Sequence, residues 1–251
     1  MTESRTTFEY LPGTYSKRRP STAVLADRYI REWEQRRLGK KKKTGATSMP
    51  PSVCISRKIG IGAVQIADLA ARKMECPVFD RQILEYIGSS GDLNEKTIRY
   101  FDERYPGKFN EFVKLLAGEK SFIMSDYGRH LISAVYSLAE SGPAIFVGRG
   151  CHLILPRDRV LAVRLIGSIP YRAKRLAALM NIDKDDAERQ LLEFDKDQRV
   201  FFRKLHGKND APAEEFDLVI NLNYFGQPEW AADVIVEAYR RKFSVDRHAS
   251  R

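Results

Sequence analysis

Beyond residue 50 the chain alternates short apolar runs with longer stretches in which apolar residues return every three or four positions. The short runs predict buried strands, and the periodic stretches predict amphipathic helices. Strands are expected at residues 53–55, 78–79, 144–147, 160–166 and 218–222. Helices are expected at residues 62–74, 81–87, 95–116, 121–141, 171–180, 184–205 and 229–243. Strands separated by helices in this way predict an α/β fold, with a mostly parallel sheet covered by helices on both faces.

The first fifty residues differ from the rest in charge. They hold 12 basic and 5 acidic side chains, and so carry +7 of the formal net charge of +10. Residues 1–20 lack periodicity, and a short helix is expected after them with an apolar face formed by Val24, Leu25, Ile30 and Trp33. Pro50 and Pro51 then interrupt the chain. We therefore expect a basic, largely flexible arm at 1–50, a domain at 51–245 and a tail at 246–251.

Charge and composition narrow the class of protein. The arm is interpreted either as a solvated tail or as a segment that binds an anionic partner, nucleic acid or a membrane surface. The chain has no run of eighteen apolar residues and its first twenty residues lack the apolar core of a secretory signal, so we expect a cytoplasmic protein without a transmembrane segment. The cysteines Cys54, Cys76 and Cys151 lie too far apart for a zinc motif or a disulfide framework, and are interpreted as small buried residues.

Polar residues gather where the predicted strands end. The first strand is followed by a turn with two glycines, which opens the helix at 62–74 and comprises Ser56, Arg57, Lys58, Ile59, Gly60, Ile61, Gly62 and Ala63. Glycines let backbone N–H groups approach a phosphate, and a helix N-terminus adds partial positive charge there. The turn lacks the terminal Gly-Lys-Ser/Thr of a standard phosphate loop. By itself it fits a phosphate site and a plain strand-to-helix turn equally well.

Arginines follow later strands. Arg149 ends the strand at 144–147, Arg172 opens the next long helix, and Arg199 and Arg203 lie four residues apart on one helical face, near Asp195. Each arginine alone is better explained by solvation or by pairing with a carboxylate than by ligand binding. Several converging arginines indicate phosphate binding, because the planar guanidinium holds phosphate oxygens and phosphoryl transfer depends on charge stabilisation.

Taken in order, these segments resemble the cytidylate kinase-like family of P-loop nucleoside monophosphate kinases. The resemblance spans about residues 53–243 and rests on the segments 55–62, 79–81, 147–150, 168–175, 195–199 and 216–221. It implies a three-layer P-loop NTPase-type α/β fold with about five parallel strands, a helical insertion that grips a monophosphate, and a helical lid. The activity that it implies is phosphoryl transfer from ATP, with Mg²⁺, to a nucleoside monophosphate with a CMP-like base.

The resemblance also assigns roles by position. The ATP phosphates would lie against Ser56, Arg57, Lys58, Gly60, Gly62 and Ala63. The acceptor nucleotide would face Asp80 and Arg81, and its phosphate would be held by Arg149. Transfer would further involve the donor-side Arg172 and three lid residues, Asp195, Arg199 and Arg203.

Departures from the family pattern keep other functions open. Relatives commonly carry Gly-Ser-Gly-Gly-Arg where this chain has Ile61 and Val64 among the turn residues, and no Ser or Thr follows to ligate magnesium. A catalytically degenerate, nucleotide-binding or regulatory relative is therefore an alternative. An NAD-type dinucleotide-binding domain is another, because Asp80 follows the glycine turn at the spacing that holds a ribose, although Gln65 replaces the third glycine. A nucleic-acid-associated protein acting through its basic arm is the last alternative. The acceptor base stays open.

Overall fold

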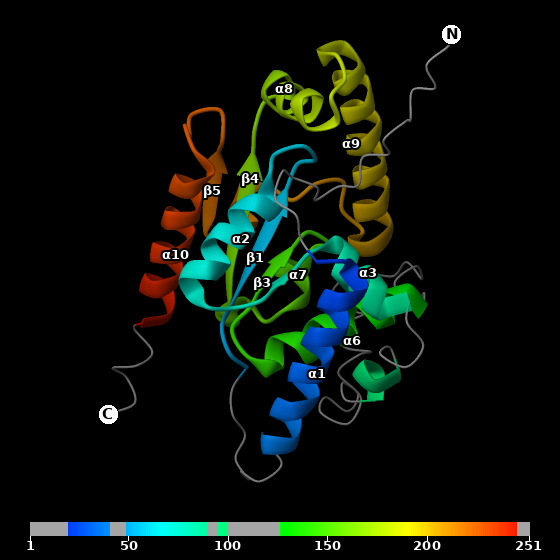
Figure 1. Ribbon diagram of the computed structural model, residues 1–251, viewed down its shortest axis with the longest axis vertical. Helices are drawn as coiled ribbons and strands as arrows, with labels where there is room; N and C mark the ends of the chain where they lie inside the picture. The colour runs from blue at the N-terminus through cyan, green and yellow to red at the C-terminus, as the bar shows by residue number, and fades with distance from the viewer. Residues whose placement is uncertain (1–19, 41–48, 90–94, 100–125, 245–251) are drawn as a thin grey trace.

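The structure is a computed structural model and describes residues 20–40, 49–89, 95–99 and 126–244 (Figure 1). At its centre lies a five-stranded sheet in the order β2-β3-β1-β4-β5. Its strands are β1 Ser52–Arg57, β2 Val78–Phe79, β3 Ile145–Val147, β4 Val160–Ile166 and β5 Leu218–Asn221. All four strand pairs are parallel, which confirms the predicted sheet.

Helices connect these strands. They are α1 Thr22–Lys40, α2 Ala63–Met74, α3 Arg81–Ser89, α6 Asp126–Ser141, α7 Cys151–Ile154, α8 Ile169–Met180, α9 Lys184–His206 and α10 Pro228–Ser244. Apart from α7, these helices lie where the sequence predicted them. Of the helix expected at 95–116, residues 95–99 are helical and the rest lie outside the described residues. The short helix α7 was not predicted, because four residues give too little periodicity to detect.

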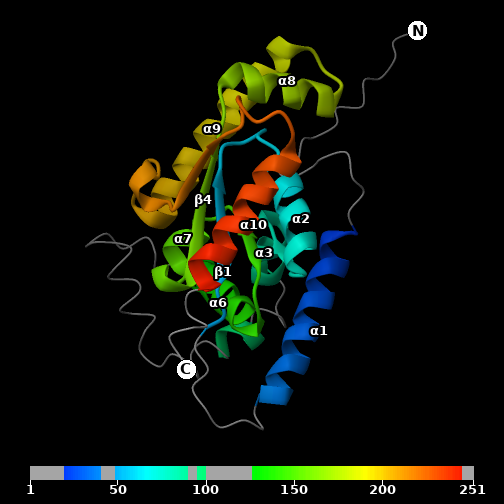
Figure 2. The same cartoon turned by 90° about the vertical axis from the view of Figure 1, so that its left-hand side faces the viewer.

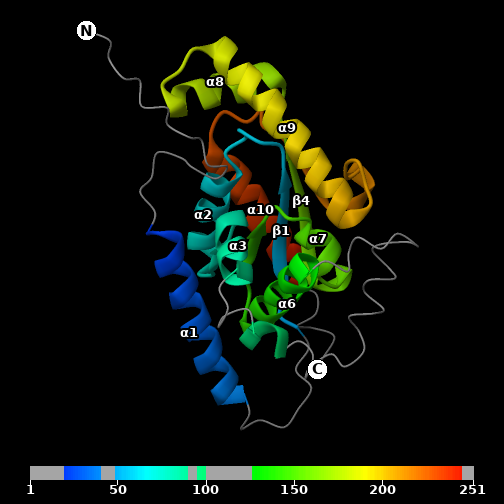
Figure 3. The same cartoon turned by 90° about the vertical axis from the view of Figure 1, so that its right-hand side faces the viewer.

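The two faces of the sheet are covered by different helices. Side chains alternate along a strand, so Val53 and Ile55 of β1 pack with α2 and α10, while Cys54 between them belongs to the core on the opposite face. Figure 2 looks onto α10, and Figure 3, from the opposite side, looks onto α7 and α9. The same alternation turns Arg164 of β4 away from the α2–α10 face, because its neighbours Val163 and Leu165 belong to that core.

Helix α8 and the first part of α9 form a hairpin beyond the carboxyl end of β4, and α9 then runs back beside the sheet (Figure 1). Ser168 caps α8 by accepting a hydrogen bond from the Tyr171 backbone N–H, and Asp183 caps α9 in the same way. The hairpin has its own apolar cluster, in which Leu176 of α8 and Leu191 of α9 pack with Ile59 from the turn after β1. The expected helical lid therefore exists as a hairpin that contacts the glycine turn.

The helix expected in the N-terminal arm packs against the domain. Leu25 and Ile30 are buried in the same core as α3 and α6, and the ring of Tyr29 meets Phe79 edge-on with centroids 4.9 Å apart. Val24, expected on the apolar face, is 59 % exposed. A boundary at residue 50 leaves outside the domain a helix whose apolar face lies in its core. The sequence alone did not reveal this contact, because the arm's charge dominates its composition.

Across residues 20–40, 49–89, 95–99 and 126–244, no helix combines the length and the apolar character that a membrane span requires.

Candidate functional site

A cavity of about 570 Å³ opens beside the carboxyl ends of β1 and β3. Cavities of this size commonly hold small-molecule ligands. Among the described residues, its cationic lining comprises Arg57, Lys58, Arg81, Arg149, Arg164 and Arg199. Its acidic lining there comprises Glu85, Asp195, Asp197 and Asp210. Positive charge is in excess, so the described lining favours an anionic ligand.

Arg149 is the most enclosed cation on the β3 side of this pocket. Its side chain is 8 % exposed, forms an ion pair with Glu85 and places its guanidinium carbon 3.8 Å from the centroid of the Phe201 ring. Burial, followed by the charges of Arg81 and Arg57, lowers the pKa of Arg149 to about 9. The guanidinium stays charged at neutral pH, and its lowered pKa reports a site that an anion would stabilise.

Glu85 joins Arg149 to a second predicted residue. The Arg81 Nε donates to both carboxylate oxygens of Glu85 at 3.1 Å, one turn along α3. The structure therefore brings Arg81 and Arg149 together, as the acceptor-phosphate prediction requires. Sequence reasoning missed Glu85, although its spacing of four residues from Arg81 was a visible signal.

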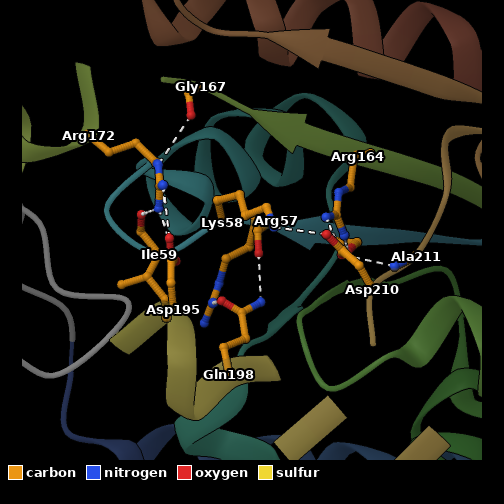
Figure 4. Close-up of polar contacts among 11 residues, drawn as sticks. Arg57, Lys58, Ile59, Arg164, Gly167, Arg172, Asp195, Gln198, Asp210 and Ala211 are labelled. Carbon is orange, nitrogen blue, oxygen red and sulfur yellow. Dashed lines mark hydrogen bonds and ion pairs between the residues drawn. The ribbon is translucent and has the colours of Figure 1, made fainter. Parts of the chain in front are cut away.

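A second charged group lies at the β4 side of the pocket (Figure 4). The buried Arg164 donates to the Ser56 hydroxyl at 2.8 Å and to Asp210 Oδ1 at 2.7 Å, and Lys58 Nζ lies 2.9 Å from Asp210 Oδ2. Burial alone would raise the pKa of Asp210, but the contacts with Lys58 and Arg164 lower it to about 2. Arg164 and Asp210 were both missed. The sequence feature that could have revealed Arg164 is its position as a single cation inside an otherwise apolar strand.

Helix α9 is tied to the turn after β1. Gln198 Nε2 donates to the Arg57 carbonyl oxygen at 2.9 Å, and the Arg57 side chain contacts Gln198 Oε1 at 3.4 Å. The exposed Arg199, the next residue on α9, lines the pocket. Arg203, also predicted as a lid arginine, is not in the pocket lining and donates instead to Asn209 Oδ1 at 2.6 Å.

Arg172 is buried and is bound by other groups of the protein. It is 4 % exposed and donates to both oxygens of Asp195 at 3.0 and 2.9 Å. Its remaining contacts are the carbonyl oxygens of Ile59 at 3.1 Å and Gly167 at 3.2 Å (Figure 4). Arg172 is absent from the pocket lining. Asp195 does line the pocket, but both of its carboxylate oxygens accept hydrogen bonds from Arg172. The pair joins α8, α9 and the glycine turn, and Arg172 lies outside the pocket lining, so its role toward a ligand stays a prediction.

Asp80 is also placed away from the pocket. It is 3 % exposed, and its Oδ1 accepts a hydrogen bond from the Ile83 N–H at 3.1 Å, which caps α3. It does not line the cavity. The substrate-binding role of Asp80 stays a prediction, and the structure places this residue outside the pocket lining.

The glycine turn has a left-handed backbone at both of its glycines. Gly60 and Gly62 have φ of +78° and +82°, and Gly62 is the N-cap of α2. The neighbouring Ile61 and Val64 are buried and apolar. A Cβ on Gly62 would lie 2.6 Å from the Arg175 guanidinium, so that cation covers the start of α2.

The position of Arg175 over Gly62 affects which ligands the glycine turn can bind. Arg175 donates to Gln65 Oε1 at 2.7 Å, and neither Gly60, Gly62 nor Ala63 lines the pocket. The glycine backbone and Arg175 fit the phosphates of a nucleotide. Among the described residues no group of three or more His, Cys, Asp or Glu could hold a metal ion, and the Ser56 hydroxyl is bonded to Arg164, so an Mg²⁺ ion would depend mainly on the nucleotide phosphates and water for its ligands.

The parallel sheet, the glycine turn at the start of α2 and the helical hairpin that contacts this turn define a protein of the P-loop fold class. Residues 52–224 match the cytidylate kinase-like family. The match covers more than half of the chain, and the protein belongs to this family.

Individual relatives are more distant. A cytidylate kinase from Sulfolobus acidocaldarius is 34 % identical over 82 residues, which are 33 % of this chain and 44 % of that protein. The chain thus matches less than half the length of this curated relative. The crystal structure of an uncharacterized protein from Eubacterium ventriosum ATCC 27560 superposes with a TM-score of 0.61 at 16 % identity, over 76 % of this chain and 98 % of that one. This likeness shows a shared fold.

Proposed function

We propose that this protein binds a nucleoside monophosphate in the cationic pocket and transfers to it the terminal phosphoryl group of ATP. The observation that carries the proposal is Arg149, a buried cation held at the end of β3 in a pocket with excess positive charge. Membership of the cytidylate kinase-like family supports the same activity.

The acceptor phosphate would bind between Arg149 and Arg81. Both cations are paired with Glu85, so a phosphate would replace that carboxylate as their common partner. The rings of Tyr127, Phe201 and Phe202 line the same cavity and offer apolar surface to a base. A CMP-like base is proposed from the name of the Sulfolobus relative, a cytidylate kinase.

The donor phosphates would lie at the start of α2. Arg175 would turn from Gln65 toward them, while Arg57 and Lys58 supply charge from the same turn. In-line transfer between two bound nucleotides requires alignment and charge stabilisation and needs no general base. Closure of the α8–α9 hairpin would exclude water. Mg²⁺ would be held mainly by the nucleotide phosphates and water, since the described residues include no group of three or more His, Cys, Asp or Glu that could hold it.

A second candidate function is nucleotide binding without turnover. The observation that favours it is the covered glycine turn, where Arg175 lies against Gly62 and the buried Ile61 and Val64 replace polar side chains. A protein of this kind would bind the monophosphate through Arg149 as well, and would fail to align a donor.

Calorimetric titration of the full chain with CMP, UMP, AMP and GMP, followed by ADP release from ATP with each monophosphate that binds, separates these functions. Binding with ADP release establishes the kinase, and binding without it establishes the second candidate. We expect Arg149→Met to weaken monophosphate binding by about 10- to 100-fold, since hydrogen bonds to charged groups contribute about 1.5–3 kcal/mol. The matched control Arg241→Ala removes an 85 % exposed arginine and should leave affinity unchanged. Failure of the full chain to bind any monophosphate would refute both functions.

A further inference from the structure

The last turn of α9 carries a buried histidine that contacts the backbone at Arg149. His206 is 3 % exposed, and its Nε2 lies 3.0 Å from the Arg149 carbonyl oxygen. The His206 ring also occupies the space where a Cβ would stand at position 150, which explains why the chain has glycine there. The ring of Phe202 lies beside it, with centroids 4.9 Å apart. His206 is thus fixed on α9 and packed directly against the Arg149–Gly150 peptide.

Arg149 needs such support because its backbone is strained. Its φ of +54° lies in the left-handed region, which non-glycine residues adopt at a cost of about 1–2 kcal/mol. Strained positions persist when the surrounding structure determines them, and they gather at functional sites. Here α9 holds both parts of the residue, since His206 contacts its carbonyl and Phe201 lies under its guanidinium.

At neutral pH His206 is in the protonation state that a hydrogen-bond donor to the Arg149 carbonyl requires. Burial lowers the pKa of His206 to about 4, and the charge of Lys208 adds to this, while the Arg149 carbonyl and Glu215 act in the opposite direction. At neutral pH the ring is therefore neutral and carries one proton. Only a protonated Nε2 can donate to the carbonyl of Arg149, which leaves Nδ1 as an acceptor, and Nδ1 has no partner among the described residues.

We propose that His206 is a positioning residue for Arg149, which fixes the guanidinium for the acceptor phosphate and couples that grip to the α8–α9 hairpin. The coupling is direct because α9 is one continuous helix: Asp195 near its middle binds Arg172 of α8, and its last turn binds Arg149. A displacement of α9 would move His206 and Phe201 together relative to the end of β3. The substrate part of this inference rests on the proposed function.

Three substitutions separate positioning from packing. His206→Phe keeps a ring and loses the donor, His206→Gln places an amide N–H near the position of Nε2, and His206→Asn carries an amide too short to reach it. The control is His152→Phe, a second buried histidine that stacks on Phe216. We expect His206→Phe and His206→Asn to raise Kd and KM for the monophosphate by about 5- to 10-fold, the value of one hydrogen bond, with little change in KM for ATP. His206→Gln should stay within about twofold of the wild type, and His152→Phe should not change Kd.

A readout without nucleotide keeps this inference separate from the proposed function. The buried Arg149 Nε–H should give a slowly exchanging ¹⁵N NMR signal, identified by its loss in Arg149→Lys, and the signal should exchange faster in His206→Asn and be restored in His206→Gln. Absence of monophosphate binding in the wild type would remove the proposed function and leave this readout as the test of positioning. A folded His206→Asn with wild-type Kd and an unchanged Arg149 signal would overturn the inference, as would an equal loss of affinity in His152→Phe. If His206→Phe does not fold, the comparison of Gln with Asn decides.

Discussion

The Arg172–Asp195 pair gives the sharpest test of how the site is built. We expect Asp195→Ala to lower the free energy of unfolding by about 3–5 kcal/mol, the typical cost of removing one partner of a buried ion pair. The structure supports the upper part of this range. Asp195 accepts two hydrogen bonds from a guanidinium that is 4 % exposed, and only the carbonyls of Ile59 and Gly167 remain to it after the substitution.

Urea unfolding followed by far-UV circular dichroism measures this change. The double variant Arg172→Met/Asp195→Leu should recover most of the loss, because apolar side chains of similar volume can replace a buried pair without leaving a lone charge. The control is Glu237→Ala, which breaks an exposed pair with Arg241 and should cost less than about 0.5 kcal/mol.

One result would refute this reasoning. If Asp195→Ala has the same urea midpoint as the wild type and yet abolishes phosphoryl transfer, the Arg172–Asp195 pair does not stabilise the fold. Arg172 would then act on the ligand, as its position in the family pattern implies.

Two further predictions concern the arm and the buried histidines. A chain that begins at residue 49 should lose about 3–6 kcal/mol of stability relative to one that begins at residue 20, because the burial of Leu25 and Ile30 is worth about 1.5–3 kcal/mol for each side chain; equal urea midpoints would support a boundary near residue 50. Stability should also fall as the pH drops from about 6.5 to 4, because burial lowers the pKa of His152 and His206 to about 4 and the unfolded chain takes up their protons first. His206 alone should account for about 3 kcal/mol of this loss, at about 1.4 kcal/mol for each pKa unit.

The pH prediction has its own control. Replacing both histidines by phenylalanine should flatten the stability profile between pH 6.5 and 4, while the loss below pH 4 should remain, because the pKa values of Asp210 and Asp217 are lowered to about 2. A profile that is equally steep in the double variant would show that other groups cause the loss.

Much of the fold could be predicted from short windows of sequence. The strands at 160–166 and 78–79 and the helix that begins at residue 184 have the predicted bounds, because a strand buried on both faces is a continuous apolar run and a helix buried on one face repeats its apolar residues every three or four positions. The same holds for Arg149 and the glycine turn, since residues that follow a parallel strand must lie at the carboxyl edge of the sheet. The role of the basic arm toward an anionic partner stays a prediction.

Other features depended on contacts between distant segments. Arg164 reaches Asp210 across 46 positions, and His206 reaches Arg149 across 57. No local pattern distinguishes Arg172, which is buried against Asp195, from Arg199, which lines the pocket, because both lie on amphipathic helices with similar spacing.

The sequence by itself thus determined the elements, their parallel order and the edge at which the chemistry lies, because periodicity and turn residues act over a few neighbouring positions. Only the tertiary structure decided which charged side chains face the cavity and which form ion pairs with one another. Burial and pairing depend on the segment that packs opposite, as α1 on α3 and the end of α9 on Arg149 show.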